Sequence, residues 1–581
     1  MPPIPKPRPK PNSRRGISPS HAAEERQGLL YDAEAAKYKS KSGHKGKGDS
    51  LSSSEYGSDF EGDDERRGWS RRKIVCTAAG LIALLIAGAL TNSVSRALKG
   101  SWVDDVPSSG SHVNGGASGS NVGVKQHFSG GVLRSNGTHD FKRTVLIVSI
   151  DGLRADYLDR GLTPHLLDIS KQGLRAKSMK PIFPTLTFPN HWALMTGLHA
   201  ESHGIVANNF WDPTLKEEFH YNQVKSCWKP EWWLGEPMWE SAEKAGIITA
   251  NLMWPGPPKT MSGASSTYFV PWRDKVPLDE KLEQIISWID LPLGERPQLI
   301  MAYEPSLDQA GHATGPYSKR VNETLVYVDT FARNLHNSLA SRNLSSIVDI
   351  VFVSDHGMTD TSHPTLIYID DILGAEGVSA IEHEDGWPAM GLRFSATADA
   401  SSYLQKLQKA SEELDYRYGG DKGGSDGRTG KKPVGKKRFS VYTAETMPER
   451  YHFSAKNSER IAPVYVVPEI DYVLTTRAEG DVGMSKGNHG YDNNEPSMHA
   501  MFVAHGPFSH DAKLTASTRL RRSASPLSEG WHSTSNDAYI MDTFQNVEIY
   551  NLVLKLLGVG SKWSAPNNGT SRGSGDPGTW G

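Results

Sequence analysis

From Thr144 onward, short apolar runs rich in β-branched residues alternate with amphipathic stretches, and this alternation constrains the fold more than any other feature. The runs TVLIVSI, QLIMAY, SIVDIVFVS and the weaker MHAMFVAHG are typical of strands buried on both faces. Between them, LDEKLEQIISWID and SKRVNETLVYVDTFARNLHNSLA have the apolar periodicity of helices. Strands that alternate with helices predict an α/β fold, in which helices cover both faces of a largely parallel central sheet.

The rest of the chain differs in composition from this region. Residues 1–73 are rich in Pro, Ser, Gly, Lys and Glu, so we expect a disordered tail. Residues 74–94 begin with the uncharged run IVCTAAGLIALLIAGAL and approach the length of about 20 residues that spans a bilayer, although a buried core helix is the alternative. Residues 95–143 are Gly/Ser-rich and predict a stalk, residues 144–570 predict the folded domain, and residues 571–581 predict a flexible tail.

The charges that flank the predicted membrane segment give its orientation. Arg66, Arg67, Arg71, Arg72 and Lys73 precede the segment, whereas only Arg96 and Lys99 closely follow it. The positive-inside rule then predicts a single-pass type II membrane protein, with a cytosolic N-terminus and a lumenal or extracellular domain. The Asn-X-Ser/Thr acceptors for glycosylation all follow the segment, as this topology requires. They are Asn136, Asn322, Asn343 and Asn568.

Composition excludes several classes of protein. The chain of 581 residues has only two cysteines, Cys76 and Cys227, so neither a disulfide-stapled scaffold nor a cysteine-rich zinc-finger array is possible. Its 64 basic and 66 acidic residues give a net charge of −2, which argues against nucleic-acid binding through bulk positive charge. Any metal must therefore be held by imidazoles and carboxylates.

Asp and His residues follow the predicted strands at the edge where open parallel sheets form their active sites. These residues are Asp151 after the first strand, Asp308 and His312 after the second, Asp355 and His356 after the third, and His489 in the turn GNHGYDN. A single aspartate after a strand is commonly a helix cap or turn residue. Repetition at successive strands indicates the carboxylate and imidazole ligands of hydrolytic zinc, and six such ligands suffice for two ions.

Thr187 lies in PTLTFPNHWALMTGL, at the turn that opens a predicted helix. It is either a simple N-terminal cap or a nucleophile at a helix N-terminus, where backbone N–H groups favour anionic oxygens. A free hydroxyl is a poor nucleophile at neutral pH, but coordination to a divalent metal would lower its pKa.

With these residues in place, the sequence resembles the ectonucleotide pyrophosphatase/phosphodiesterase (type I phosphodiesterase) family of the alkaline phosphatase superfamily, and its topology is similar to that of the fungal type II members. The motifs that carry the resemblance are IDGLRADYL, PTLTFPNHWALMTGLHAESHGI, GHATGP, SDHGM, GNHGYDN, DTFQNVEIYNLVLKLLG and APNNGT, in the order of the family. The resemblance implies an alkaline-phosphatase-like α/β/α sandwich, with residues 144–570 as the catalytic domain.

The resemblance also implies a role for each site residue. One Zn²⁺ would be held by Asp151, Thr187, Asp355 and His356, and a second Zn²⁺ by Asp308, His312 and His489. Thr187 would be the nucleophile and would form a covalent threonyl-nucleotidyl intermediate that water hydrolyses. Asn208 would donate to the phosphoryl oxygen. Phe188 and Trp272 would enclose the nucleobase.

The implied function is hydrolysis of phosphodiester and pyrophosphate bonds of nucleotides, such as nucleoside triphosphates, dinucleotides and nucleotide sugars, to release nucleoside 5′-monophosphates. No specific nucleic-acid binding and no protein partner follow from the sequence. The alternatives are a phosphomonoesterase, a phospholipid-type phosphodiesterase or a transferase of the same superfamily, and a non-catalytic membrane-anchored binding domain. Where animal members usually have Glu-Glu-Pro, this chain has Pro305-Ser306-Leu307, so we expect local substrate contacts to differ.

Overall fold

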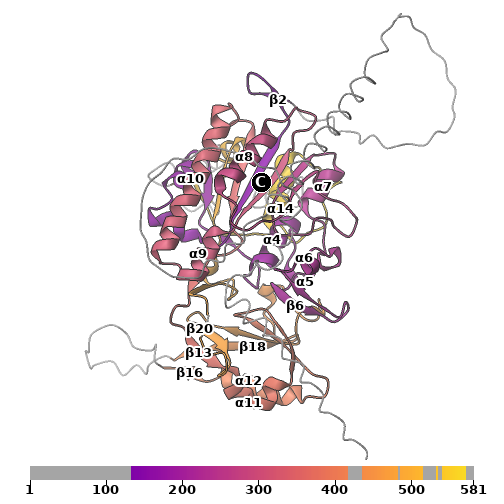
Figure 1. Ribbon diagram of the computed structural model, residues 1–581, viewed down its shortest axis with the longest axis vertical. Coiled ribbons are helices and arrows are strands. Elements are labelled where there is room, and N and C mark those ends of the chain that lie inside the picture. Colours follow the sequence, from indigo (N-terminus) through magenta and orange to yellow (C-terminus); the bar gives the residue numbers. More distant parts are fainter. Residues whose placement is uncertain (1–132, 417–434, 482–483, 514–530, 534–538, 571–581) are drawn as a thin grey trace, which may run out of the picture. The chain divides into compact units, whose positions relative to one another are not determined.

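The structure is a computed structural model that describes residues 133–416, 435–481, 484–513, 531–533 and 539–570 (Figure 1). The predicted tail (1–73), membrane segment (74–94) and C-terminal tail (571–581) lie outside the described residues. Among the helices of the described ranges, none has both the length and the apolar character needed to cross a membrane. The last part of the predicted stalk is described, and it forms the antiparallel pair β1 (Arg134–Ser135) and β2 (Asp140–Phe141).

A nine-stranded mixed sheet forms the centre of the fold. Its strand order is β23 (Trp531–Ser533), β24 (Tyr539–Met541), β4 (Leu174–Ala176), β22 (Phe502–His505), β11 (Val348–Val353), β3 (Thr144–Ile150), β10 (Leu299–Glu304), β8 (Thr249–Leu252) and β9 (Tyr268–Val270). The five strands from β11 to β9 are parallel, and β22 is antiparallel to both of its neighbours. All four predicted strands are therefore present, but the last of them makes the sheet mixed.

Helices cover both faces of this sheet, which explains why every residue of β3 is buried. Val145 and Ile147 pack into one core with Trp192 of α4 (Thr187–Thr196), together with α7 (Met238–Lys244) and α14 (Glu548–Leu557). The alternate residues Leu146 and Val148 pack into a second core with α3 (Pro164–Gln172), α8 (Leu278–Ile289) and α10 (Lys319–Ser341). Figure 1 shows α8 and α10 on the opposite side of the sheet from α4, α7 and α14. The helices predicted from LDEKLEQIISWID and SKRVNETLVYVDTFARNLHNSLA are α8 and α10.

A four-stranded antiparallel sheet forms a second, smaller layer. Its order is β14 (Ile381–Asp385), β15 (Met390–Phe394), β19 (Val464–Pro468) and β18 (Phe439–Thr443). It packs with α11 (Ile369–Ser379) and α12 (Ala400–Ser411) around a separate apolar core that includes Leu392 and Phe439. The turn between β14 and β15 carries Trp387, which reaches the candidate site described below.

Short elements connect these layers. They are η2 (Ala155–Arg160), β5 (Met179–Lys180), α5 (Ala200–His203), β6 (Asn209–Asp212), β7 (Glu217–His220), α6 (Val224–Cys227), η3 (Pro230–Trp232), α9 (Ser306–Thr314), β12 (Thr359–Asp360), β13 (Thr365–Tyr368), β16 (Leu414–Asp415), β17 (Lys436–Lys437), η4 (Glu449–Tyr451), β20 (Tyr472–Thr475), β21 (Gly487–Asn488), η5 (Pro496–Met498) and β25 (Phe544–Gln545). Pairing of β12 with β21 brings the GNHGYDN turn beside the residues that follow β11.

The four predicted glycosylation acceptors lie in the described part of the chain. Asn343 and Asn568 are exposed, and Asn136 and Asn322 are partly exposed.

Candidate active site

The residues predicted at strand ends meet at the carboxyl edge of the central sheet. Asp151 directly follows β3, and Asp355 follows β11 after a single serine. Asp308 and His312 lie on one face of α9, which follows β10 and tolerates Gly311 in its interior. The β12–β21 pairing places His489, the residue after β21, beside them. The structure therefore brings together Thr187 and the six predicted Asp and His ligands.

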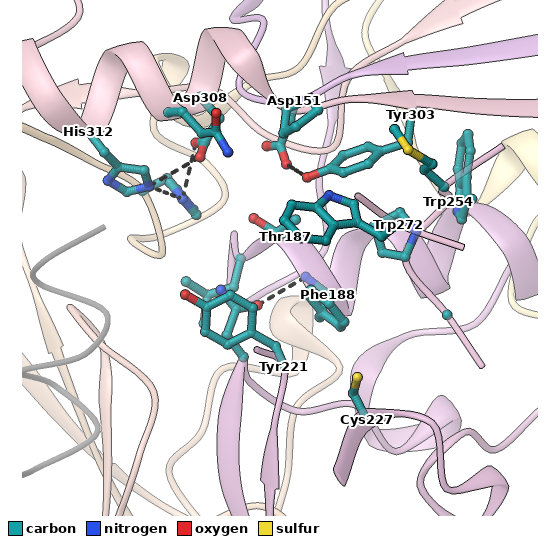
Figure 2. Close-up of a pocket in the computed structure, with 18 of the residues that line it drawn as sticks. Asp151, Thr187, Phe188, Tyr221, Cys227, Trp254, Trp272, Tyr303, Asp308 and His312 are labelled. Carbon is teal, nitrogen blue, oxygen red and sulfur yellow. Dashed lines mark hydrogen bonds and ion pairs between the residues drawn. The ribbon is translucent and has the colours of Figure 1, made fainter. Parts of the chain in front are cut away.

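Asp308, His312 and His489 form the first cluster. The Nε2 atom of His312 lies 3.4 Å from Oδ2 of Asp308, and Nε2 of His489 lies 3.5 Å from Oδ1 of the same carboxylate. The two Nε2 atoms are 3.1 Å apart (Figure 2). These three side chains present ligand atoms that all lie within 4.8 Å of one another, which is the arrangement needed to hold one cation.

Asp151, Thr187, Asp355 and His356 form the second cluster. The Nε2 atom of His356 lies 3.0 Å from Oδ2 of Asp355, 3.4 Å from Oδ1 of Asp151 and 3.1 Å from Oγ1 of Thr187. The imidazole of His356 stacks on that of His489 with ring centroids 3.5 Å apart, so the two clusters are adjacent. Asp151, Asp308 and His356 also form a group within 4.8 Å, which spans both clusters.

The three ligand imidazoles are oriented by the main chain. The Nδ1 atoms of His312, His356 and His489 lie 2.8, 2.9 and 2.8 Å from the carbonyl oxygens of Gly487, Gly357 and Thr185. Each Nδ1 therefore carries the proton that it donates to a carbonyl, and these hydrogen bonds direct each Nε2 atom toward the site, where it can bind a metal ion. The Nε2 atoms of His312 and His489 face each other at 3.1 Å, so one cation can bind both.

The carboxylates of the site need positive charge. The buried atoms Oδ1 of Asp151, Oδ1 of Asp308 and Oδ2 of Asp355 accept no hydrogen bond in the described structure. Burial raises the pKa of the Asp151 carboxyl well above its usual range, and the nearby carboxylates of Asp355 and Asp308 raise it further. Burial also raises the pKa of Asp308. Unpartnered buried carboxylate oxygens beside imidazole lone pairs fit divalent metal ions.

The pKa values of the site histidines shift in opposite directions. Burial tends to lower the pKa of His356, but the carboxylates of Asp355 and Asp308 raise it above its usual value. Burial lowers the pKa of His489 well below its usual value, and the imidazoles of His356 and His312 lower it further. Burial tends to raise the pKa of the Asp355 carboxyl, but the nearby imidazoles of His356 and His191 hold this pKa below its usual range. His489 is therefore neutral at physiological pH, which is the state in which an imidazole binds metal.

Thr187 is the first residue of α4, and its hydroxyl lies at the N-terminus of this buried helix. The N-cap position is occupied by Leu186, so Thr187 is not the N-terminal cap of this helix. Asn208 lies beside it, because its Oδ1 accepts a hydrogen bond of 3.0 Å from the backbone N–H of Phe188. This bond uses the Oδ1 atom of Asn208 and leaves its Nδ2 group available as a donor, and Asn208 lines the same cavity as Thr187.

A cavity of about 140 Å³ opens beside the two clusters, and we call it the metal-ligand cavity. Asp151, Thr187, Asn208, Asp308, His312 and His489 line one part of it. Aromatic side chains line the rest: Phe188, Tyr221, Trp228, Trp254, Phe269, Trp272, Tyr303 and Trp387 (Figure 2). Both residues predicted to enclose a nucleobase are among them. Phe188 is held by an edge contact with Tyr221 at 5.4 Å, and Trp272 is half-buried.

Sequence reasoning missed two buried residues of the site. The Oη atom of Tyr303 donates a 2.5 Å hydrogen bond to Oδ2 of Asp151. His191 lies 2.9 Å from both Oγ of Ser149 and the carbonyl oxygen of Thr187, and 3.4 Å from Oδ2 of Asp355. Asp151, His191 and Asp355 also have ligand atoms within 4.8 Å of one another, but both nitrogens of His191 already have hydrogen-bond partners. Its spacing four residues after Thr187 on one helix was the available signal.

Comparisons with known proteins identify the family. A profile described as type I phosphodiesterase/nucleotide pyrophosphatase matches residues 145–492. An uncharacterized pyrophosphatase/phosphodiesterase of Schizosaccharomyces pombe is 36% identical over 445 residues, which are 76% of this chain and 81% of that protein. This chain belongs to the type I phosphodiesterase family. It is therefore a hydrolase of phosphodiester bonds. Human ectonucleotide pyrophosphatase/phosphodiesterase family member 1 is 32% identical over 430 residues, which are 73% of this chain and 40% of the human protein.

Solved structures of the family agree with the fold. Murine ectonucleotide pyrophosphatase/phosphodiesterase 5 superposes with a TM-score of 0.59 and 27% identity, covering 74% of this chain and 98% of the murine chain. The type I phosphodiesterase described here therefore has the alkaline-phosphatase-like α/β fold, with a mixed central sheet. A second structure of the murine protein is of an inactive threonine-to-alanine variant in complex with AMP.

Proposed function

We propose that this phosphodiesterase hydrolyses phosphodiester and pyrophosphate bonds of nucleotides and nucleotide derivatives, and releases nucleoside 5′-monophosphates. The observation that carries the proposal is the position of the Thr187 hydroxyl at a helix N-terminus, 3.1 Å from Nε2 of His356 and near carboxylates that each have one buried oxygen without a hydrogen bond. The murine relative that was solved with AMP supports a nucleotide as the substrate class.

The residues present fit two Zn²⁺ ions. We assign Asp151, Thr187, Asp355 and His356 to one ion, and Asp308, His312 and His489 to the other. Their oxygen and imidazole donors without thiolate match catalytic zinc. When bound, the ions supply the positive charge that activates a hydroxyl and stabilises the oxygens of a phosphoryl group in an in-line displacement.

Thr187 acts as the nucleophile in this proposal. Its Oγ1 loses its proton to solvent and forms a bond to phosphorus, while the bond from phosphorus to the leaving oxygen breaks and that oxygen takes a proton from water. A water molecule then attacks the phosphorus, the bond to Oγ1 breaks, and Thr187 regains a proton. The helix N-terminus and the Nδ2 donor of Asn208 stabilise the negative charge that develops on the phosphoryl oxygens.

The aromatic part of the cavity binds the nucleoside. We assign Phe188 and Trp272 to the nucleobase because both line the metal-ligand cavity beside Thr187. Aromatic stacking on a base contributes about 1–3 kcal/mol and tolerates different bases. The enzyme is then expected to accept several nucleotides.

The experiment that tests the function uses the full-length protein in detergent. Wild type, Thr187→Ala and Thr187→Ser are assayed with the nitrophenyl ester of thymidine monophosphate and with nitrophenyl phosphate. We expect turnover of the diester, loss of turnover in Thr187→Ala and partial recovery in Thr187→Ser, which retains a hydroxyl. Preference for nitrophenyl phosphate would instead favour a phosphomonoesterase, and full activity of Thr187→Ala would remove Thr187 from its role. Metal analysis of the same samples counts the zinc.

The location of the enzyme is a separate part of the proposal. We assign residues 74–94 to a signal anchor that places residues 144–570 in the lumen or outside the cell, glycosylated at Asn136, Asn322, Asn343 and Asn568. The basic residues before residue 74 support this orientation. Activity on an added nucleotide is compared in intact and permeabilised cells, and mobility on gels before and after removal of N-glycans. If added nucleotide is hydrolysed and N-glycans are removed only after permeabilisation, the catalytic domain lies in an internal compartment. A gel mobility that does not change on removal of N-glycans would mean that the chain is unglycosylated, which would contradict the topology.

A further inference from the structure

A second cavity adjoins the metal-ligand cavity, and its volume is about 520 Å³. Pro305 and Gln309 line both cavities, so the two are neighbours across the start of α9. Trp272 and Asp308 line the first cavity (Figure 2), and Arg273, the residue after Trp272, lines the second. A substrate held at Thr187 therefore has this second cavity next to it.

The lining of the second cavity is predominantly basic, and we call it the basic cavity. Its charged residues are Arg273, Lys275, Lys281 and Arg320 on the basic side, and Glu304 and Glu323 on the acidic side. They come from the loop after β9, from α8, from the end of β10 and from the first turns of α10.

Both acidic residues already have cationic partners. Oε2 of Glu304 lies 2.6 Å from Nζ of Lys281, and this pair is buried, with 5% and 3% of the two side chains exposed. Oε1 of Glu304 accepts a 2.9 Å hydrogen bond from the backbone N–H of Ser306. Glu323 pairs with Nζ of Lys319 at 3.2 Å. Neither carboxylate is therefore the partner of Arg320.

Arg320 is the cation available to a ligand. It is exposed, and its guanidinium makes no hydrogen bond or ion pair with any residue that the structure describes. Arg273 and Lys275, in contrast, are paired with Glu280 and Asp274. The buried Oγ of Ser306, another residue that lines the cavity, also has no hydrogen-bond partner in the described chain. A planar guanidinium and a free hydroxyl together match the oxygens of a phosphate group.

We propose that the basic cavity is a subsite for a second phosphate group of the substrate, with Arg320 as its principal ligand. This inference rests on the proposed function and specifies its substrate class: nucleotides that carry another phosphate besides the one attacked by Thr187. That phosphate belongs either to the leaving group, as in a nucleoside triphosphate, or to the ribose, as in a nucleoside 3′,5′-bisphosphate. The chemistry is the same in both cases.

The test compares three substrates on the full-length protein in detergent. The nitrophenyl ester of thymidine monophosphate has one phosphate, ATP adds phosphates on the leaving group, and the 5′-nitrophenyl ester of adenosine 3′,5′-bisphosphate adds one on the ribose. The variant is Arg320→Ala. The matched control is Arg333→Ala, which removes the same side chain from an exposed position of α10 that lines neither cavity.

We expect Arg320→Ala to lower kcat/KM about tenfold for the substrate that uses the subsite, which corresponds to about 1.4 kcal/mol. For Arg320→Ala, kcat/KM for the singly phosphorylated ester changes less than twofold, and for Arg333→Ala kcat/KM for all three substrates changes less than twofold. In wild type, added salt should also lower the ratio of kcat/KM for the substrate that uses the subsite to kcat/KM for the singly phosphorylated ester. In Arg320→Ala, this ratio should fall less with added salt. A loss confined to ATP assigns the cavity to the leaving group, and a loss confined to the bisphosphate ester assigns it to the ribose.

Two results would overturn the inference: an equal loss on all three substrates, or no loss on any of them. These results differ from failure of the proposed function, in which wild type itself would hydrolyse none of the three substrates. If Arg320→Ala does not fold, Arg320→Gln replaces it, and the same ratios decide the question.

Discussion

The hydrogen bond from Tyr303 to Asp151 gives the sharpest prediction about the metal centre. Tyr303→Phe removes only the hydroxyl that donates to Oδ2 of Asp151 at 2.5 Å. Because Oδ1 of Asp151 already accepts no hydrogen bond in the described structure, the variant leaves both oxygens of this buried carboxylate without a hydrogen-bond donor. The ring itself stays in place, so the apolar packing of β10 is retained.

The magnitude follows from the kind of bond that is lost. A hydrogen bond to a charged group contributes about 1.5–3 kcal/mol. Loss of a partner that orients a metal ligand typically lowers metal affinity by about 10–100-fold, which is about 1.4–2.8 kcal/mol. The two ranges agree, so we expect Tyr303→Phe to weaken zinc binding at the Asp151 cluster by about 10–100-fold.

The assay titrates metal-free full-length protein with zinc in competition with a chelator of known affinity. Tyr268→Phe is the control, because its hydroxyl donates to the carbonyl of Glu295 at 2.9 Å, outside the metal-ligand cavity. Zinc affinity of Tyr303→Phe within twofold of wild type would refute the reasoning. An equal loss in Tyr268→Phe would show that the effect is not specific to the site.

Three further predictions concern the hydrogen-bond donor to the phosphoryl oxygen, the pH dependence of stability and the geometry of the metal ligands. Asn208→Ala should lower kcat by about 10²–10³ while zinc content is unchanged, measured by steady-state kinetics and metal analysis, and a loss below tenfold would contradict its role. Burial raises the pKa of Asp349 to about 6, so the folded state holds a proton that the unfolded chain has released, and the free energy of unfolding falls between about pH 4 and pH 6 by up to about 3 kcal/mol. Urea unfolding of Asp349→Asn should lack this part of the decrease, and identical pH profiles of variant and wild type would exclude it. Gly487→Ala would place a Cβ 2.5 Å from the carbonyl oxygen of Gly311, so we expect zinc affinity in the chelator titration to fall at least about tenfold. Gly560→Ala is the control, because a Cβ there has no atom within 4 Å, and zinc affinity should not change. Equal zinc affinities of the two variants would mean that the turn adapts to the added methyl group.

The sequence was sufficient for the central part of the fold. Runs such as TVLIVSI are apolar at every position because both sheet faces are covered, and this pattern is independent of distant contacts. The apolar pattern of a strand does not indicate its direction in the sheet, so the antiparallel pairing of β22 with β11 was not predicted. The short strand β8, with the sequence TANL, gave no recognisable run, and its burial depends on its neighbour β10.

The candidate site was predictable where chemistry and topology coincide. Asp151, Asp308 and Asp355 were found because parallel strands end at one edge, and the structure places them together there. Tyr303 was missed because a tyrosine near the end of an apolar strand looks like a core residue. The basic cavity was missed because α8, α9 and α10 come together only in the folded chain.

The main-chain carbonyls that hold His312, His356 and His489 have a consequence for how this enzyme can change. A carbonyl oxygen is present whatever residue occupies its position, so no single side-chain replacement deletes any of these three anchors. The aromatic and basic walls, in contrast, consist wholly of side chains. Replacement of wall residues such as Trp272 and Arg320, in nature or by engineering, can therefore change substrate preference while the orientation of the three histidines is retained.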